Sequence, residues 1–411
     1  MSRIKIKNFG PIREGFIEND GWMDVKKVTV LIGDQGSGKS TVAKLISTLS
    51  WIEKDLFRSE GATLRYRKQE RNFNSLLEYH RINEYLKDNT EILYEGDAYK
   101  IGYKKGQNLD IQLISDNVYS LPKITYYPAE RNFVSSVRQS KNSNKQSFKL
   151  WSQSLQEFKE IFHETKENFK DKEVLNLPIG NVVLEYNKLN DILYVKGNDY
   201  KIQLADSASG FQSFVPLFVV ANYVSELPEK GGEMDELQRE IFKKESARIL
   251  IDKIYTEEQK RILLSNLASQ FNIKRTLNII EEPEQNLFPS SQHEMLNKLL
   301  EFNNKNQNNE MIVTTHSPYI IGYLTLAVKA NELFGMAKTD EIIDRINEIV
   351  PQKSVVSRKE LVIYELDDRD GSIHKLEDYK GIPSGKNYLN RELAEKNELY
   401  AKLLDIEDIC Q

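Results

Sequence analysis

The sequence predicts an α/β fold that combines a mixed core sheet, an antiparallel β subdomain and a helical insertion. Residues 28–32 form an apolar, β-branched run, which is typical of a strand buried on both faces. A glycine-rich loop follows this run, and after it comes a stretch with apolar residues at helical spacing. Residues 276–280 and 311–315 are further candidates for buried strands. We expect all three runs in a parallel part of the core sheet.

The antiparallel elements are expected from alternating runs outside that core. Residues 3–7 alternate like an edge or half-exposed strand, and residues 91–94 and 100–103 have the pattern of a hairpin around Gly96. A small antiparallel meander is predicted from three more runs, at residues 182–186, 192–196 and 200–204.

Residues 221–270 are highly charged and mostly helical in pattern, which predicts the helical insertion. Two interpretations stay open: a solvated helical hairpin, or a surface on which a partner docks. The segment is far too short for a long coiled-coil arm. Beyond it, a strand is expected at residues 361–366 and a final charged helix at about 388–404.

Charge and composition exclude several classes of protein. The 411 residues carry 57 basic and 62 acidic side chains, a net charge of −5, so charge does not indicate nucleic-acid binding. Cys410 is the single cysteine, which excludes a disulfide framework and a cysteine-based metal site and fits a reducing cytoplasm. No apolar run reaches the roughly 18 residues of a membrane span. We therefore expect a cytoplasmic protein without a membrane partner.

The glycine-rich loop matches the phosphate-binding pattern G-x-x-x-x-G-K-S/T. Glycines let backbone N–H groups turn toward phosphate oxygens, and the following helix presents its positive end to them. Lys39 would neutralise the β- and γ-phosphates, and the Ser40 hydroxyl would hold Mg²⁺. The alternative, a plain glycine turn, is disfavoured by the strand before it and the helix after it. The predicted nucleotide-binding residues are Gly33, Asp34, Gln35, Gly36, Ser37, Gly38, Lys39, Ser40 and Thr41.

Two adjacent carboxylates, Glu281 and Glu282, follow the strand expected at residues 276–280. Ligands bind at the carboxyl ends of strands in open α/β sheets. One carboxylate can hold Mg²⁺ directly or through its water, and the next can act as general base toward an attacking water. Alone, such a pair is usually a solvated strand end. Beside a phosphate loop it indicates nucleotide chemistry.

His316 stands just past the third strand, at residues 311–315. A lone histidine at a strand end is more often structural than catalytic. Here three strands end in polar side chains, and the ends of parallel strands converge on one edge of a sheet. We therefore expect His316 to contact the γ-phosphate or the lytic water.

A fourth motif comprises Ser207, Ser209, Gly210 and Gln212, which precede an apolar helix at residues 214–223. Serine hydroxyls and backbone N–H groups at a helix N-terminus make an anion site. The local alternative is an ordinary serine N-cap, and nothing in this stretch says which phosphate it would face.

Taken in order, these motifs resemble an ABC-type ATPase head of the soluble kind shared by SMC proteins, RecF and the OLD ATPases. The resemblance covers roughly residues 1–60, 120–135, 200–225 and 275–330. It implies a single head over residues 1–411. Within it we expect an inserted α/β lobe at 53–120 and 138–200, the helical insertion at 222–270 and a C-terminal extension at 351–411.

The resemblance also implies roles for the motifs. The glycine loop becomes the Walker A loop, and Glu281 and Glu282 become the Walker B pair, with Glu281 toward the metal and Glu282 as catalytic base. His316 becomes the switch histidine, acting in catalysis with Lys39 and Glu282. Residues 207–212 resemble the signature that contacts, in trans, the γ-phosphate bound by the opposite subunit.

The chain departs from the family pattern at several points. Glu281 stands where most ABC proteins have aspartate, and the pair Ser209 and Gly210 replaces the usual double glycine of the signature. Glu130 and Arg131 occupy the place expected of the Q-loop glutamine, which suggests a variant lid or a sensor for the partner subunit. Residues 284–287 resemble the D-loop. No adenine-stacking residue is evident, so ATP rather than GTP comes from the resemblance.

As a function, the resemblance implies Mg²⁺-dependent hydrolysis of ATP sandwiched between two heads, in a homodimer or a higher even-numbered homo-oligomer. The chain is similar to stand-alone ATPases of bacterial antiphage systems, of the PtuA and AriA kinds, which hold a separately encoded effector. We therefore expect an effector partner, such as a nuclease or a toxin.

Two alternatives remain. The first is a DNA-repair or DNA-loading ATPase of the RecF or SMC kind, which would need a basic groove. Residues 64–73 are the best candidate for one, although a solvated helix face explains them too. The second is a non-hydrolysing scaffold, against which Glu282 and His316 argue. The acidic cluster at residues 367–370 is interpreted as a solvated turn rather than a nuclease site.

Overall fold

The computed structural model describes most of the chain. Residues 64–72 of the expected basic strip, much of 222–270 and much of the helix expected at 388–404 lie outside the described residues. The described ranges are 2–58, 73–104, 109–114, 119–136, 151–169, 174–229, 236–252, 255–256, 272–379, 382–383, 387–391, 398–400 and 402–403, with the single residues 260, 264, 267 and 385.

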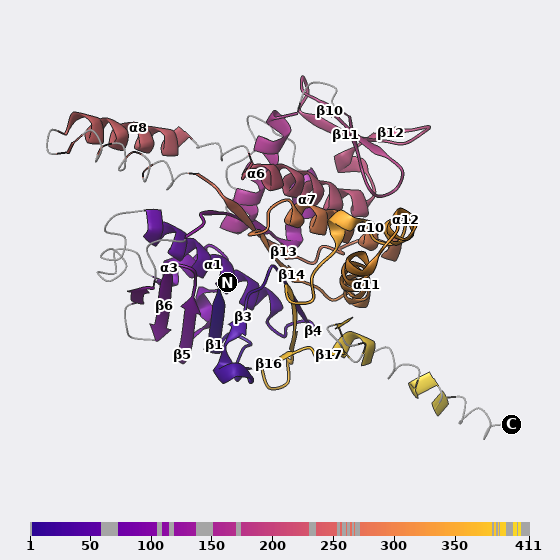
Figure 1. Ribbon diagram of the computed structural model, residues 1–411, viewed down its shortest axis with the longest axis horizontal. Coiled ribbons are helices and arrows are strands. Elements are labelled where there is room, and N and C mark those ends of the chain that lie inside the picture. Colours follow the sequence, from indigo (N-terminus) through magenta and orange to yellow (C-terminus); the bar gives the residue numbers. More distant parts are fainter. Residues whose placement is uncertain are drawn as a thin grey trace.

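A seven-stranded mixed sheet forms the core, in the order β2-β16-β15-β4-β14-β13-β8 (Figure 1). The strands from β15 to β8 are parallel to one another, and β16 is antiparallel to β15. The predicted mixed core sheet and its three buried strands are confirmed. The strand bounds are β2 Gly15–Phe16, β4 Val28–Gly33, β8 Pro122–Tyr127, β13 Arg275–Glu281, β14 Glu310–Thr314, β15 Leu361–Leu366 and β16 Ser372–Lys375.

The register of the three central strands decides which residues meet at one edge of the sheet. Leu31 of β4 pairs with Thr314 of β14, and Thr314 pairs with Glu281 of β13. Because the strands are parallel, the chain leaves all three at the same edge. The loops that follow β4, β13 and β14 therefore lie side by side.

A second sheet is antiparallel throughout, in the order β3-β1-β5-β6-β7. Glu95 pairs with Lys100, which confirms the predicted hairpin. The N-terminal strand is half-exposed as expected, but its placement at an edge is wrong, because β1 lies between β3 and β5. The bounds are β1 Arg3–Phe9, β3 Met23–Asp24, β5 Leu86–Glu95, β6 Tyr99–Lys104 and β7 Asp110–Leu113.

Helix α1 (Lys39–Arg58) fills the space between these two sheets. Its apolar stripe packs in one buried cluster with Ile6 and Ile92 of the antiparallel sheet and with Leu277 and Ile312 of the core sheet. The residues of this stripe that the spacing predicted, all buried, are Val42, Leu45, Ile46 and Leu49.

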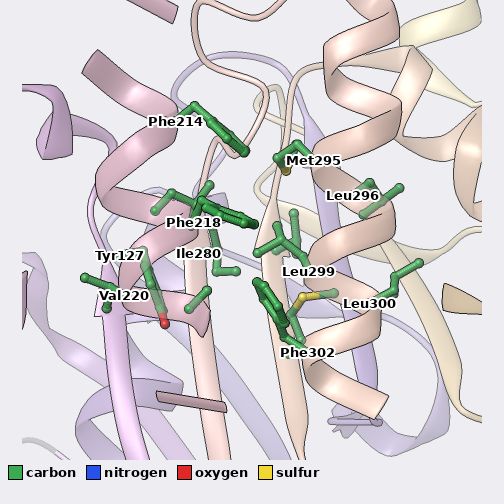
Figure 2. Packing of buried hydrophobic residues seen from close by; sticks show 14 of the residues in the cluster. Tyr127, Phe214, Phe218, Val220, Ile280, Met295, Leu296, Leu299, Leu300 and Phe302 are labelled. Atoms are coloured by element: carbon green, nitrogen blue, oxygen red, sulfur yellow. The ribbon is translucent and has the colours of Figure 1, made fainter. Parts of the chain in front are cut away.

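Helices cover the other face of the core sheet (Figure 1). Figure 2 shows Phe218 of α7 between the core strands and α10, and the Phe218 ring lies 5.3 Å from that of Phe214 and 5.7 Å from that of Phe302. The helices here are α6 Gln153–Glu167, α7 Ser209–Glu226, α10 Pro289–Asn304, α11 Pro318–Met336 and α12 Asp340–Asn347.

The predicted meander is confirmed as part of a four-stranded sheet in the order β12-β11-β10-β9. Its bounds are β9 Val174–Asn176, β10 Val183–Asn187, β11 Ile192–Lys196 and β12 Lys201–Gln203. The remaining elements are α3 Phe73–Glu78, α4 Asn132–Ser136, β17 Asp378–Tyr379, β18 Ile382–Pro383 and the 3-10 helices η1 Asn19–Gly21, η2 Asn83–Tyr85, η3 Ala129–Arg131, η4 Leu204–Asp206 and η5 Gln352–Ser354.

Helix α8 (Glu236–Ile251) projects away from the rest of the molecule (Figure 1). At its end, Leu250 and Ile251 expose 55% and 78% of their surface. The predicted α/β fold class is thus confirmed, with a mixed core sheet, an antiparallel β subdomain and a helical insertion. Within the described part of the chain, no helix combines the length and the apolar character that crossing a membrane requires.

Candidate functional site

The loop between β4 and α1 has backbone conformations that favour glycine. Gly33, Gly36 and Gly38 have φ angles of +145°, +84° and +102°. A Cβ on Gly33 would lie 2.4 Å from the Leu366 carbonyl oxygen, and one on Gly38 would lie 2.5 Å from Ile12. By contrast, no described atom lies within 4 Å of a Cβ built on Gly36. The loop therefore packs closely against the rest of the protein at Gly33 and Gly38 and has open space at Gly36.

Lys39, at the start of α1, folds back over this loop. Its Nζ donates hydrogen bonds to the carbonyl oxygens of Gly33 at 3.0 Å and Asp34 at 2.7 Å. Burial lowers the pKa of Lys39 to about 8, and the nearby carboxylates of Glu282, Asp34 and Glu284 oppose that shift. The buried Ser37 hydroxyl has no hydrogen-bond partner in the described structure. A cation held by carbonyls and an unpaired donor both fit a site for phosphate.

The other loop residues surround Lys39. The Asp34 carboxylate accepts hydrogen bonds from the Gln35 N–H at 2.6 Å and from the Tyr388 hydroxyl at 3.0 Å, and these bonds lower its pKa. Ser40 is half-buried and Thr41 is buried in the first turn of α1. Tyr388 comes from the C-terminal part of the chain, a contact with the loop that no sequence pattern indicated.

Glu281 and Glu282 end β13 with their side chains in different surroundings. Glu281 is buried; its Oε2 accepts a hydrogen bond from the Ala129 N–H at 3.2 Å, and its Oε1 has no partner among the described residues. Glu282 is half-exposed and takes a left-handed φ of +42°. Its own N–H donates to the Thr314 carbonyl at 2.9 Å, which ties the turn to β14.

His316 meets Glu282 across the sheet edge. Its Nε2 lies 3.5 Å from Glu282 Oε1. The hydrogen bond with His316 lowers the pKa of Glu282, while burial opposes this shift, so the carboxylate is charged at neutral pH. The sheet thus brings Lys39, Glu282 and His316 into one electrostatic neighbourhood, as the sequence predicted from three strand ends.

Glu284 is a further member of the site whose role the sequence did not reveal. Its Oε1 accepts hydrogen bonds from the Thr315 hydroxyl at 2.7 Å and from the His316 N–H at 2.8 Å. Burial raises its pKa, and these two bonds oppose the shift. Expected only as the first residue of the D-loop, Glu284 instead holds the turn that carries His316.

Arg131 is the second such residue. It is fully buried, and its guanidinium donates to four carbonyl oxygens: Glu281 at 2.7 Å, Glu282 at 2.7 Å, Pro128 at 3.2 Å and Ser213 at 3.2 Å. Burial lowers its pKa to about 10, so it stays charged. A sensor role for Arg131 at a partner surface is wrong, because its side chain ends inside its own subunit. The β8 sequence places it after a strand, but only the fold shows which carbonyls it meets.

The predicted signature residues begin α7. Ser207 donates its hydroxyl to the Leu204 carbonyl at 2.7 Å, and Gln212 donates to the carbonyls of Ala205 and Ser207 at 3.0 and 2.7 Å. The serine N-cap alternative is wrong: the N-cap is Ala208, and no side-chain bond caps the helix. Ser209 is exposed there.

The signature helix contacts the predicted D-loop of its own subunit. The Asn286 side chain donates to the Ser213 hydroxyl at 3.1 Å, and a Cβ on Gly210 would lie 2.8 Å from the Asn286 carbonyl oxygen. Because Ser213 also contacts Arg131, the start of α7 is connected through Arg131 to the carbonyls of the Glu282 turn.

The acidic cluster is a turn between β15 and β16, which confirms the solvated-turn interpretation. The Asp367 carboxylate accepts a hydrogen bond from the Arg369 guanidinium at 2.6 Å, and Asp370 accepts one from the Ser372 N–H at 2.8 Å. In the part of the chain that the structure describes, no group of three or more His, Cys, Asp or Glu side chains is arranged to hold a metal.

Comparison with known families identifies the fold. The profile of the family described as AAA ATPase domain matches residues 1–321, well over half of the chain. The chain belongs to this AAA ATPase family. No curated protein sequence matches it.

Solved structures to which this AAA ATPase chain is similar include SMC heads and an ABC cassette. An SMC head bound to the C-winged helix domain of ScpA is 11% identical, with 91% of this chain and 96% of that chain covered and a TM-score of 0.37. The SMC head domain from Thermotoga maritima is 11% identical, with 78% of this chain and 90% of that chain covered and a TM-score of 0.31. A nucleotide-free ATP-binding cassette from an ABC transporter is 13% identical, with 93% of this chain and 94% of that chain covered and a TM-score of 0.32.

We predict that nucleotide binding takes up a proton in alkaline solution. Above pH 8 Lys39 is mostly neutral in the free protein, because its pKa is about 8. Phosphate charge next to the amine raises that pKa, so binding at pH 9 restores the proton. Calorimetry of Mg-ATP binding in two buffers with different ionisation heats should show close to one proton taken up at pH 9 and almost none at pH 7. Lys39→Arg, which stays charged, should show none at either pH, and equal uptake by both proteins would contradict the assignment.

We predict that Arg131 positions the Glu282 turn. Arg131→Met leaves the carbonyls of Glu281 and Glu282 without their donors, and small displacements of reacting groups cost roughly 100-fold in rate. Turnover of ATP should therefore fall by about that factor while KM, set by the phosphate loop, changes little. Exposed Glu130→Gln is the neighbouring control and should behave like wild type. Unchanged turnover in a folded Arg131→Met protein would refute this role.

Proposed function

We propose that the chain is a Mg²⁺-dependent ATPase that works as a switch, with ATP held between two heads. The pairing of Glu282 with His316, 3.5 Å apart beside the phosphate loop, is the observation that carries this proposal. A plain binding scaffold has no use for a charged carboxylate paired with a histidine at that position. ATP and water would give ADP and phosphate.

In this mechanism Lys39 leaves the carbonyls of Gly33 and Asp34 and neutralises the β- and γ-phosphates. Glu282, ionised through its hydrogen bond with His316, accepts the proton of the attacking water. His316 orients that water or the γ-phosphate, and Arg131 fixes the backbone of the Glu282 turn.

The residues fit a Mg²⁺ ion. Glu281 has one buried carboxylate oxygen without a partner in the described structure, and Ser40 presents a hydroxyl at the start of α1. Oxygen donors are the ligands that Mg²⁺ prefers, together with phosphate oxygens and water. When bound, the ion would supply neutralisation of phosphate charge.

The hydrogen bonding and exposure of the signature residues are the reason for proposing a second head. The side chains of Ser207 and Gln212 are engaged within their own turn, whereas Ser209 is exposed at the N-terminus of α7. That end offers a hydroxyl and backbone N–H groups to an anion. We propose that it meets the γ-phosphate bound by a second copy, so that ATP binding favours a homodimer or a higher even-numbered assembly.

For the biological role, we propose the ATPase component of a bacterial antiphage system, located in the cytoplasm and controlling a separate effector protein such as a nuclease or a toxin. The apolar end of α8, with Leu250 and Ile251 exposed, supports a docking surface for such a partner. Of the candidate DNA-binding strip at residues 64–73 the structure describes only Phe73, so the DNA-repair alternative stays a prediction.

We predict that the Glu282→Gln protein doubles its mass in Mg-ATP, because bound ATP is no longer consumed and the closed state accumulates. Light scattering coupled to size-exclusion chromatography measures this mass, and phosphate release from wild type measures turnover. Glu282→Gln should lower turnover by about 100-fold or more. Adding Ser209→Arg should restore the smaller mass. A mass indifferent to ATP in both proteins would contradict the two-head arrangement.

We predict that protection of cells against phage depends on the phosphate loop. Bacteria that express this chain with its neighbouring genes should give fewer phage plaques than bacteria that lack them. Lys39→Met, which removes the phosphate-binding charge, should return plaque numbers to those of unprotected cells. Protection that persists with Lys39→Met would refute control by nucleotide.

A further inference from the structure

A cavity of about 280 Å³ lies between α1, α3, α6 and the edge strand β8. Trp51 lines it from α1, Tyr79 and His80 line it from the turn after α3, and Tyr126 lines it from β8. A second cavity of about 250 Å³ shares His80 and Tyr126 with the first and extends to Glu281. Small-molecule sites typically occupy roughly 300–1,000 Å³, and the two adjoining cavities together lie in that range.

His80 lines both cavities, and with Tyr126 and Glu281 it belongs to the buried side chains there that have polar atoms without a hydrogen-bond partner in the described structure. Only 2% of its surface is exposed, and neither ring nitrogen has a hydrogen-bond partner in the described structure. The rings of Tyr79 and Tyr126 flank it, with centroids at 4.6 and 4.5 Å. Buried polar groups are nearly always paired, so two unpaired nitrogens on one ring point to a place where a bound molecule can be held.

The protonation state of His80 determines which hydrogen-bonding groups its ligand must have. Burial, with Lys44 nearby, lowers the pKa of His80 to about 3, so the ring is neutral at physiological pH. A neutral imidazole has one N–H donor and one acceptor nitrogen, on opposite sides of the ring. The ligand therefore supplies an acceptor on one side of His80 and a donor on the other.

Other polar side chains of the first cavity form hydrogen bonds within the protein, so they do not require a charged ligand. The Thr48 hydroxyl donates to the Lys44 carbonyl at 2.9 Å, and the Tyr79 hydroxyl donates to the Glu157 carboxylate. The second cavity is lined by two cationic side chains, Lys44 and Arg81, and by two carboxylates, Glu130 and Glu281. Flat aromatic faces and balanced charge both favour an uncharged planar ring.

We propose that the two cavities bind a nucleoside, with its base among the aromatic rings of the first cavity and its sugar hydroxyls in the second. His80 lines both cavities and pairs with both parts. Tyr126 lines both cavities, and Glu281 lines the second one. The occupied site would thus reach Glu281, the proposed metal ligand, although nucleoside binding does not depend on the proposed ATPase activity.

The test is titration calorimetry of the full-length protein with adenosine, guanosine, cytidine and uridine, each with and without saturating Mg-ATP. At least one nucleoside should bind once per chain, equally well in both conditions, and more tightly than its 5′-monophosphate. His80→Leu should weaken that binding by roughly tenfold or more, because it removes two hydrogen bonds. Its melting temperature should not fall, because the variant also removes two unpaired polar atoms.

His293→Leu is the matched control. This histidine stacks on Tyr323 at 4.4 Å, and its buried Nε2 is also unpaired in the described structure, but it lines neither cavity. The control should bind the nucleoside like wild type. If His80→Leu unfolds, Trp51→Ala, at a half-exposed wall position, replaces it and should also weaken binding. Absence of binding by all four nucleosides, loss of binding in Mg-ATP, tighter binding of the monophosphate, or full binding by a folded His80→Leu protein would each overturn the proposal.

Discussion

The parallel pairing of β4, β14 and β13 is the constraint on which the site depends. Leu31, Thr314 and Glu281 share one register, so the loop of Lys39, the turn of His316 and the turn of Glu282 leave the sheet at one edge. These residues are far apart in the sequence and would not otherwise meet. A slip of one residue in any of the pairings would turn every side chain of that strand to the other face. Strands β4 and β13 are buried along their whole length, so their side chains pack into the core on both faces of the sheet.

A second group of contacts holds the backbone at this edge. Glu282 takes a left-handed conformation, which costs a non-glycine residue about 1–3 kcal/mol. The Thr314 carbonyl accepts its N–H, and Arg131 donates to its carbonyl, so the strained turn is bound from both sides. Glu284 holds the His316 turn in the same way. The geometry of the reacting side chains thus depends on two side chains, Arg131 and Glu284, that form hydrogen bonds with the backbone.

Much of this arrangement was predictable from sequence. Uninterrupted apolar runs predicted the central strands, glycine spacing predicted the phosphate loop, and polar residues after each strand predicted that Glu282 and His316 would converge. The rest was not predictable, because long-range partners leave no local pattern. Arg131 looks like any charged residue after a strand, and only the fold buries it against four carbonyls. The contact of Tyr388 with Asp34 and the unpaired ring of His80 are likewise products of tertiary packing.

We infer that Lys39 Nζ, bound to the carbonyls of Gly33 and Asp34, occupies the place that nucleotide phosphates take. The most direct test is a crystal structure with Mg²⁺ and a slowly hydrolysed ATP analogue. We expect Lys39 Nζ to leave both carbonyls and contact the phosphates, and Ser40 and Glu281 to hold the metal. A nucleotide bound elsewhere, with Lys39 still bonded to the loop, would contradict it.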